Sequence, residues 1–428
     1  MLSRLLSALI HEGTLIVLRP GAQPLTFGEG KPQMTIRFHD RRAVLAFALN
    51  PDLKFGELYM DGRLTIEDGG DIVSLLDFLM SNLARQGLSG WHKAGRMARR
   101  ILRPLQQFNP ARRAKSHVAH HYDLSGELYD LFLDKDRQYS CAYFAEPGMN
   151  LENAQAAKKR HIMAKLNLDR PGLRVLDIGC GWGGMALDLA RNARAEVLGV
   201  TLSEEQIGVA KARAAQNDLT ACIKFKLIDY RAIKGQFDRI VSVGMFEHVG
   251  APHYDAFFKK VRNLLTEDGV MLLHTIGRSD GPGATNAWIA KYIFPGGYAP
   301  ALSEVLAAIE RNGLIVTDVE VLRLHYAETL REWQRRFQVH RAEIARLYDE
   351  RFCRMWEFYL AGAEMSFRHD GQVVFQIQIA KRVDALPLTR DYMIERERAM
   401  KLAQSGAMLF TTRPAPSSWP VNRPDSSA

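Results

Sequence analysis

The stretch Val175-Leu-Asp-Ile-Gly-Cys-Gly-Trp-Gly-Gly184 decides the fold of this chain. Its pattern is that of a buried strand, a turn containing Gly179, Gly181 and Gly183, and the start of a helix. Glycines allow such a turn to be tight and to bring its backbone close to a ligand. In an open α/β sheet this turn lies at the carboxyl edge of the first strand, where ligands bind next to the free amides of the following helix. The segment therefore predicts a nucleotide-type site on an α/β sheet.

Strand-like and helical stretches alternate on the C-terminal side of this segment. The expected helices are Glu204–Gln216 and Tyr254–Leu265, and the expected strands are Arg174–Ile178, Glu196–Thr201, Ile223–Ile228, Phe237–Val243 and Val270–His274. This rhythm predicts a Rossmann-like α/β fold with a doubly wound, mostly parallel sheet. Two later runs, Leu314–Leu322 and Val373–Ala380, are expected to be antiparallel edge strands.

Changes in composition divide the chain into four parts. Residues 1–90 are expected to form a smaller α+β domain, with strands at Thr14–Leu18 and Met34–Phe38 and a helix at Asp71–Leu83 whose N-cap is Asp71. Residues 91–115 are a basic linker, and residues 116–390 are the main α/β domain. Residues 391–428 are expected to be a short helix and a disordered tail rich in Pro and Ser.

Positive charge is concentrated in the linker. The chain of 428 residues has a formal net charge of +9, which suits either nucleic acid or an anionic membrane surface. Between Trp91 and Lys115 there are eight basic residues and no acidic residue, with apolar side chains interleaved. The segment is equally compatible with an amphipathic element on anionic headgroups and with a solvated linker helix.

Several classes of protein are disfavoured by what the chain lacks. The apolar run Leu5–Ile10 is too short for a signal-peptide core, and no apolar stretch is long enough to span a bilayer, so a cytoplasmic location is expected. The four cysteines form no CxxC pair, which argues against a disulfide framework and a zinc site. His117, His120 and His121 have no acidic partner at ligand spacing, so no metal is predicted.

The glycine-rich turn has a more specific parallel. Its D-x-G-x-G-x-G spacing, with Asp177 still on the strand, resembles the signature loop of class I S-adenosylmethionine-dependent methyltransferases. Such sites usually have an acid after the second strand to bind the ribose hydroxyls, and here Thr201 and Gln206 are the expected substitutes. After the third strand, Asp229 could accept a hydrogen bond from the adenine amine while Tyr230 packs on the ring; alternatively, Asp229 caps a turn.

Seven short motifs, in one order, carry a family resemblance. They are His121-Tyr-Asp-Leu-Ser125, Gln138-Tyr-Ser-Cys-Ala-Tyr143, Val175 to Gly184, Gly199-Val-Thr-Leu-Ser203 with Gln206, Val243-Gly-Met-Phe-Glu-His248, Leu273-His-Thr-Ile-Gly277 and Lys291-Tyr-Ile-Phe-Pro295. Over residues 116 to 385 the chain resembles the cyclopropane-fatty-acid synthase and mycolic-acid cyclopropane synthase family. The segment Gly56-Glu-Leu-Tyr-Met-Asp-Gly62 is similar, less specifically, to bacterial lipid-modifying members.

The resemblance implies a reaction and its partners. The methyl group of S-adenosylmethionine would be transferred to a cis double bond in an acyl chain of a membrane phospholipid, and loss of a proton would close a cyclopropane ring. It further implies peripheral association with the inner face of the membrane, a possible homodimer, a lipid-handling or dimerisation role for residues 1–90, and cofactor contacts from Tyr139, Ser140 and Leu202. Because the intermediate is a carbocation, the site must be dry and can use aromatic faces. Candidates are Tyr139, Tyr143, Phe246, Trp288, Tyr292 and Phe294.

The resemblance also implies that the base is a bound bicarbonate ion. The residues that the resemblance assigns to it, called the anion site below, are Cys141, Glu247, His274, the backbone of Ile276, and Tyr326. Taken singly, His274 could be a core histidine, Glu247 an acid at a helix start and Cys141 a small buried hydrophobe. Glu247 could also be the base itself. Many relatives have a cysteine where this chain has Ala363, so a thiol at that position is not required here.

Three other functions compete with this interpretation. A methyltransferase of exocyclic amines in nucleic acid would carry a D/N-P-P-Y/F motif after the fourth strand, where this chain has Gly244-Met-Phe-Glu-His248, so no nucleic-acid partner is expected. A fatty-acyl methyltransferase that yields a methyl-branched or methyl-alkene product would share every cofactor motif. A non-catalytic lipid-binding protein would not bind S-adenosylmethionine.

Overall fold

The computed structural model describes residues 2–86 and 125–404, which form two sheets. The four-stranded sheet has the order β2-β1-β3-β4, and the seven-stranded sheet has the order β10-β11-β9-β8-β5-β6-β7. The basic linker at 91–115, the histidines at 117, 120 and 121, and the tail from 405 lie outside the described residues. The linker and tail interpretations therefore stay predictions.

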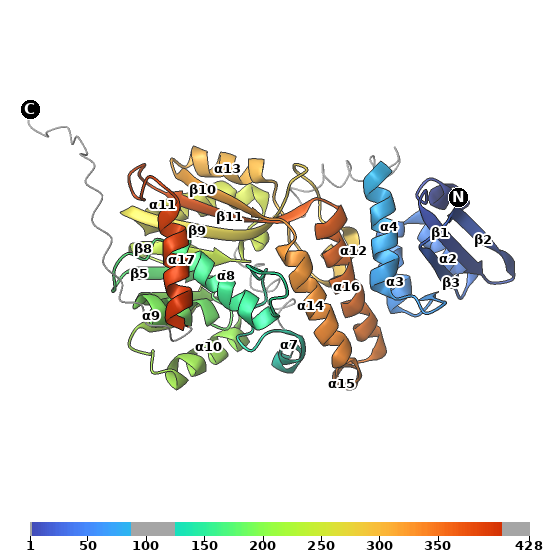
Figure 1. Ribbon diagram of the computed structural model, residues 1–428, viewed down its shortest axis with the longest axis horizontal. Helices are drawn as coiled ribbons and strands as arrows, with labels where there is room; N and C mark the ends of the chain where they lie inside the picture. Colours follow the sequence, from blue (N-terminus) through green and yellow to red (C-terminus); the bar gives the residue numbers. More distant parts are fainter. Residues whose placement is uncertain (1, 87–124, 405–428) are drawn as a thin grey trace, which may run out of the picture.

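The N-terminal part is a small α+β unit at the right of Figure 1. Its elements are α1 (Leu2–Ser7), β1 (Gly13–Arg19), β2 (Ala22–Glu29), β3 (Gln33–Phe38), α2 (Arg41–Leu49), α3 (Pro51–Met60), β4 (Leu64–Ile66) and α4 (Ile72–Gln86). Strand β1 pairs antiparallel with β2 and parallel with β3. Asp71 is the N-cap of α4, as predicted. Its Oδ1 accepts a hydrogen bond of 2.7 Å from the backbone N–H of Ser74.

The seven-stranded sheet has the expected parallel core. Its strands are β5 (Arg174–Ile178), β6 (Glu196–Thr201), β7 (Ile223–Leu227), β8 (Phe237–Val243), β9 (Leu265–Arg278), β10 (Ile315–Leu322) and β11 (Gln372–Ala380). Strand β9 extends well beyond the expected Val270–His274. The prediction of two edge strands was wrong for β11, which lies between β9 and β10 and pairs antiparallel with both. Both sides of β11 are occupied, and its residues from position 373 to 380 are buried, including the polar Gln376 and Gln378.

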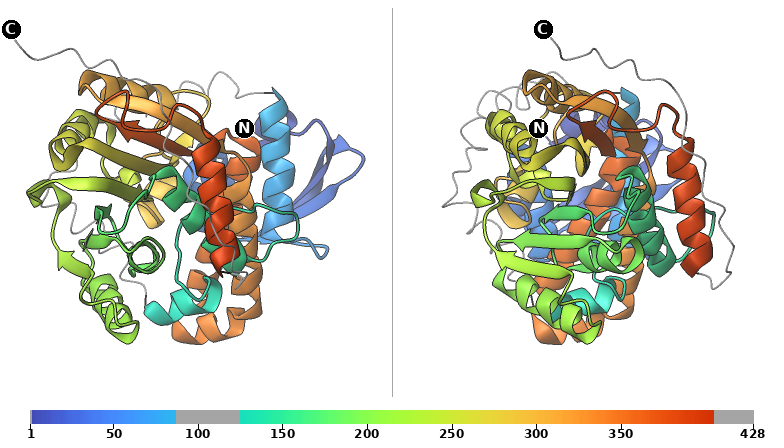
Figure 2. Two further views of the ribbon diagram at one scale, coloured as in Figure 1. Left: turned by 60° about the vertical axis from the view of Figure 1, so that its left-hand side comes forward. Right: turned by 90° about the vertical axis from the view of Figure 1, so that its left-hand side faces the viewer.

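Helices cover both faces of this sheet. They are α7 (Gly126–Phe132), α8 (Leu151–Lys165), α9 (Gly184–Ala193), α10 (Glu204–Gln216), α11 (Tyr254–Leu264), α12 (Ala287–Tyr292), α13 (Leu302–Arg311), α14 (His325–Val339), α15 (Arg341–Leu347), α16 (Glu350–His369) and α17 (Asp391–Gln404), with short 3₁₀ turns η1 (Tyr230–Ala232), η2 (Phe246–His248) and η3 (Ala251–His253). Helix α17 packs on α8, and both views of Figure 2 show it at the surface of the molecule. Most of α8 is therefore enclosed, including its lysines.

Helices α14 and α16 lie between the two sheets (Figure 1). Helix α16 contacts α14 on one side and α3 and α4 on the other. The contact depends on Gly56 of α3, because a Cβ atom there would lie 2.5 Å from Nε1 of Trp288 and 2.8 Å from Cε1 of Phe358. The glycine of the Gly56–Gly62 motif thus allows the N-terminal part to pack closely on α12 and α16.

No helix in residues 2–86 or 125–404 is long and apolar enough to cross a bilayer.

Candidate active site

A pocket lies at the carboxyl ends of β5, β6, β7 and β8. It is lined by ten of the residues predicted to bind the cofactor, namely Tyr139, Ser140, Asp177, Gly179, Gly181, Thr201, Leu202, Gln206, Asp229 and Tyr230. The loop before α8 and the middle of α8 close one side through Arg137, Gln138 and Lys158. The parallel strands thus bring the predicted residues together at the ligand edge of the sheet.

The three glycines of the turn have different roles. All have positive φ, at 82° for Gly179, 52° for Gly181 and 83° for Gly183. A Cβ atom on Gly179 or Gly183 would lie 2.8 Å from Met245 or Phe225, whereas one on Gly181 would meet nothing within 4 Å. Gly181 therefore leaves space open in the pocket. Gly183 does not line the pocket and is the N-cap of α9, where the absence of a side chain allows close packing; its predicted contact with the cofactor stays a prediction.

Asp177 is a buried carboxyl group at the end of β5. Burial raises its pKa to about 7. Its Oδ2 atom is buried, and no hydrogen-bond partner for it exists within the described part of the chain. An unpaired buried oxygen is costly, so this atom suits a hydrogen-bond donor supplied by a ligand.

The predicted ribose ligands are joined to each other. Thr201 Oγ1 donates to Gln206 Oε1 at 2.9 Å and accepts from the backbone N–H of Ser203 at 3.2 Å. Because the oxygen of the Gln206 amide accepts from Thr201, its Nε2 atom is the group left to donate to a ligand.

Asp229 both lines the pocket and caps a turn, and its predicted contact with adenine stays a prediction. Its carboxylate accepts from the backbone N–H of Arg231 at 2.9 Å and from the Arg231 guanidinium at 2.8 Å and 2.5 Å. Asp229 is thus the N-cap of η1, the turn-capping alternative, although it lines the pocket. The Tyr230 ring also lines the pocket and packs edge-on against Phe257, with centroids 5.4 Å apart.

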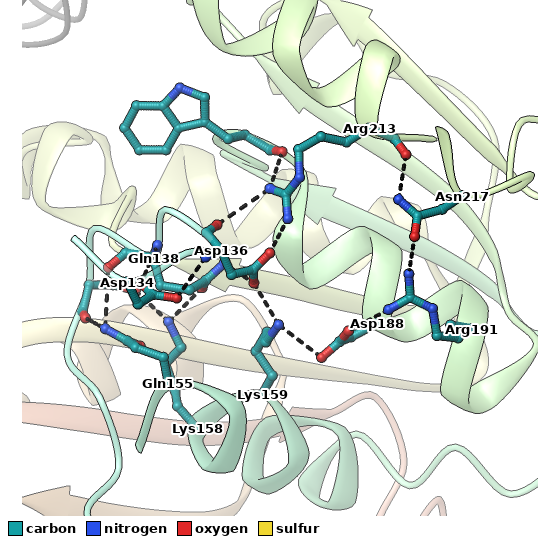
Figure 3. Close-up of polar contacts among 12 residues, drawn as sticks. Asp134, Asp136, Gln138, Gln155, Lys158, Lys159, Asp188, Arg191, Arg213 and Asn217 are labelled. Carbon is teal, nitrogen blue, oxygen red and sulfur yellow. Dashed lines mark hydrogen bonds and ion pairs between the residues drawn. The ribbon is translucent and has the colours of Figure 1, made fainter. Parts of the chain in front are cut away.

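Lys158, which the sequence did not single out, lies against the same pocket. Its Nζ donates to Gln138 Oε1 at 2.7 Å and to Ser140 Oγ at 2.8 Å, and burial lowers its pKa to about 8. Figure 3 shows that Lys159 points to a different group, bridging Asp136 at 2.5 Å and Asp188 at 3.0 Å. The two lysines fix the loop that carries Tyr139 and Ser140. A lysine in mid-helix usually indicates an exposed face, so no sequence signal marked this role.

The residues of the anion site do not line this pocket but lie next to it. Ser140 lines the pocket while Cys141, the next residue, belongs to a buried apolar cluster with Tyr326, against which Ile276 packs. Likewise Met245 lines the pocket, and Glu247 follows two residues later on η2. The chain thus passes directly from one site to the other at two places.

Glu247 and Ile276 are in direct contact. Glu247 Oε1 accepts a hydrogen bond of 2.6 Å from the Ile276 backbone N–H. Burial raises the pKa of Glu247 to about 7, and its Oε2 atom is buried with no hydrogen-bond partner in residues 2–86 and 125–404. The Ile276 amide, expected to donate to the anion, is engaged with Glu247 in this structure.

The other three groups are neutral donors. Burial lowers the pKa of His274 well below its usual value and raises the pKa of the Cys141 thiol. The Tyr326 ring packs on Phe367 at 4.9 Å between centroids. The Ala142 amide, next to Cys141, donates to Thr329 Oγ1 at 3.0 Å, and this joins the Cys141 loop to the helix that carries Tyr326.

The aromatic candidates lie in more than one place. Phe246 stacks on Tyr254 at 4.4 Å in a separate core cluster. Trp288 belongs to the apolar cluster of Cys141 and Tyr326 and is buried against Met60 at the contact with α3. Tyr139 stacks on Trp333 at 5.1 Å, and its hydroxyl lies 3.0 Å from that of Tyr359. Trp333 and Tyr359 were missed because they lie on α14 and α16, far along the chain.

No group of three or more potential metal ligands occurs in the part of the chain that the structure describes.

Comparison with known proteins identifies the family. Residues 109–377 match the family described as mycolic acid cyclopropane synthetase. The chain belongs to this family. It is an S-adenosylmethionine-dependent methyltransferase with the class I fold, which confirms the predicted fold class and type of enzyme.

Three relatives show the extent of the similarity. A cyclopropane-fatty-acyl-phospholipid synthase of Escherichia coli K12 is 39% identical over 334 residues, covering 78% of this chain and 84% of the relative. A probable fatty acid methyltransferase of Pseudomonas putida is 35% identical over 375 residues, covering 85% of this chain and 92% of the relative. The mycolic acid cyclopropane synthase CmaA1, solved with SAH and CTAB, is 35% identical with a TM-score of 0.59, covering 64% of this chain and 99% of that one.

Proposed function

We propose that this enzyme transfers the methyl group of S-adenosylmethionine to the cis double bond of an unsaturated acyl chain in a membrane phospholipid and closes a cyclopropane ring. The observation that carries the proposal is the buried Glu247 Oε2 atom, which has no hydrogen-bond partner in the described residues; Glu247 lies in the chain between Met245 and His248, two residues that line the cofactor pocket. The cyclopropane synthases among the relatives support it.

The pocket residues fit S-adenosylmethionine, which supplies the methyl group when bound. The Oδ2 atom of Asp177 needs a donor, and the ammonium group of the methionine part is one. Gln206 Nε2 can donate to a ribose hydroxyl, and Tyr230 provides a ring face for adenine. Gly181 lets the backbone approach the ligand.

The anion site fits bicarbonate, which supplies a small base when bound. Cys141, His274 and Tyr326 can donate to its oxygens, and Glu247, when ionised, can accept from its hydroxyl. Glu247 as the base itself is the alternative within the same site.

The aromatic cluster suits the cation that methyl transfer creates. When the methyl carbon bonds to one alkene carbon, the sulfur–methyl bond breaks and positive charge develops on the other alkene carbon. Loss of one proton from the new methyl group then lets the C–H electron pair close the ring. Tyr139 contacts both Trp333 and Tyr359, and these rings can stabilise that charge while excluding water.

A related function would end at a methyl-branched or methyl-alkene product, as the name of the Pseudomonas putida relative allows. Mass spectrometry of host-cell lipids, with and without expression, distinguishes the two. Cyclopropanation adds one CH₂ to phospholipid acyl chains and removes the alkene signal. A product that keeps the alkene contradicts the ring-closing step, and unchanged lipids contradict the proposal as a whole.

Bicarbonate has its own test. Turnover should slow in buffer stripped of dissolved carbon dioxide and should recover when bicarbonate is added. If stripped buffer leaves the rate unchanged while Glu247→Gln abolishes turnover, the base is Glu247.

We further propose that the enzyme is cytoplasmic and docks peripherally on the membrane, and that residues 1–90 handle lipid or form a homodimer contact. The linker with its eight basic residues supports docking, since anionic headgroups attract such segments.

A further inference from the structure

His274 and Gln376 are directly opposite each other in the sheet. They are paired in the antiparallel register of β9 and β11, which puts both side chains on the same face. Both are almost fully buried, and His274 Nδ1 lies 3.2 Å from Gln376 Nε2. The Gln376 amide is therefore hydrogen-bonded to Nδ1, one of the two ring nitrogens of His274.

Lys165, at the end of α8, determines which way the Gln376 amide faces. Lys165 Nζ lies 2.8 Å from Gln376 Oε1, and an ammonium group can only donate. The amide oxygen must therefore face Lys165, which leaves the NH₂ group facing His274. In this arrangement Gln376 donates and His274 Nδ1 accepts.

Glu320 favours the charged form of Lys165. Its Oε2 atom contacts Lys165 Nζ and also lies 2.6 Å from His161 Nε2. These contacts lower the pKa of Glu320 to about 2 against the effect of burial, so it is ionised. Burial lowers the pKa of Lys165, and the Glu320 carboxylate opposes that change. The carboxylate thus anchors a chain of donors that ends on His274.

We propose that Lys165 and Gln376 are positioning residues that hold His274 as the neutral tautomer with its proton on Nε2. The hydrogen bond at Nδ1 accounts for the acceptor nitrogen, and burial keeps the ring from taking a second proton by lowering the pKa of His274. The N–H on Nε2 is then a permanent donor. This inference rests on the proposed function, in which His274 donates to a bound anion.

Burying these three hydrogen-bonded side chains costs desolvation free energy, which apolar side chains in the same places would not cost. Lys165 on α8 and Gln376 and His274 on the sheet are all buried, and each buried polar atom requires a partner. Groups that orient a functional side chain commonly have such an arrangement, because they fix both its direction and its tautomer.

Nitrogen NMR of the full-length enzyme labelled with ¹⁵N-histidine tests the tautomer directly. The chain has 13 histidines, and the His274 signals are assigned by their loss in His274→Gln. We expect a neutral ring protonated at Nε2. A ring protonated at Nδ1, or an imidazolium, would overturn the inference whatever the variants do.

Gln376→Met and Gln378→Met form a matched pair that tests positioning. Gln378 is also buried and lies on the same face of β11, but it donates to the Lys165 backbone oxygen and, at 2.7 Å, to Tyr392. Gln376→Met should give a mixture of His274 tautomers and lower turnover at saturating bicarbonate about 10-fold or more, with affinity for S-adenosylmethionine unchanged. Gln378→Met should keep the single tautomer and the turnover.

The outcomes separate this inference from the proposed function. A single Nε2 tautomer and full turnover in Gln376→Met would show that Gln376 is not needed to position His274, and this result would overturn the inference. If the wild type has the expected tautomer but its turnover does not depend on bicarbonate, the result contradicts bicarbonate as the base and leaves the positioning inference standing. Should Gln376→Met not fold, the wild-type spectrum and Gln376→Asn, which shortens the side chain, decide the question.

Discussion

Glu247 Oε1 accepts a 2.6 Å hydrogen bond from the Ile276 amide, while Glu247 Oε2 is buried and finds no partner in the described residues. One oxygen of this carboxyl group therefore joins η2 to β9, and the second oxygen is left for a ligand. This asymmetry leads to the first prediction.

Glu247→Gln should stabilise the fold in a pH-dependent way. Burial raises the pKa of Glu247 from 4.5 to about 7, so between these values the folded protein binds a proton that the unfolded chain has released. The free energy of unfolding contributed by this group therefore falls as pH rises toward 7. Urea unfolding should show the variant more stable than wild type by on the order of 3 kcal/mol at about pH 8, and nearly equal at about pH 4.5. An equal difference at both pH values would contradict the raised pKa.

The same variant should lose turnover rather than cofactor affinity. The amide keeps the size of the carboxyl but presents an NH₂ group, so we expect turnover to fall by about 100-fold or more. Glu364→Gln is the control, because Glu364 is also buried with a raised pKa but is paired with Arg368 on α16. Steady-state rates and calorimetry with S-adenosylmethionine measure the two effects. Equal losses in both variants would argue for a general effect of buried charge.

Gly181→Asp should abolish binding of S-adenosylmethionine and keep the fold. The position opens on the pocket, and a Cβ atom added there would have no protein atom within 4 Å, so a carboxylate at this position meets the ligand. Gly208→Asp, at an exposed and open position on α10, adds the same charge away from the pocket. Calorimetry showing unchanged affinity in Gly181→Asp would contradict the assignment of this pocket.

Gly56→Ala should loosen the contact between the N-terminal part and α12. Its Cβ would lie 2.5 Å from Trp288, which forces movement costing about 1–3 kcal/mol. Gly208→Ala serves as a control, since it should instead stabilise its helix by about 1 kcal/mol. Thermal unfolding compares them, and a stable Gly56→Ala variant would show that this contact can adjust.

Reversal of Arg96, Arg99, Arg100 and Arg103 to Glu should weaken sedimentation with anionic vesicles, and high salt should have the same effect on the wild type. The matched control reverses four exposed lysines of the methyltransferase domain: Lys211, Lys224, Lys234 and Lys259. Equal binding by both variants would favour a solvated linker.

The sequence predicted the parallel core of the sheet closely, because β5, β6 and β8 are short, buried and bounded by turns. It missed β2, whose Pro24 and Gly28 argue against a strand and whose residues are mostly exposed. It placed β11 at an edge, since strand order depends on contacts between distant segments. Lys165 and Gln376 were missed for a similar reason: their roles exist only after α8 has packed against β11.

The position of α8 constrains attempts to redesign the enzyme. Lys158 touches the cofactor pocket and Lys165 holds Gln376, and seven residues of helix separate the two by about 10 Å. One helix thus sets the spacing between the cofactor pocket and the Gln376–His274 pair. Engineers who want to change the aromatic cluster would do better to vary α14 and α16, because any shift of α8 would move the cofactor pocket and the Gln376–His274 pair together.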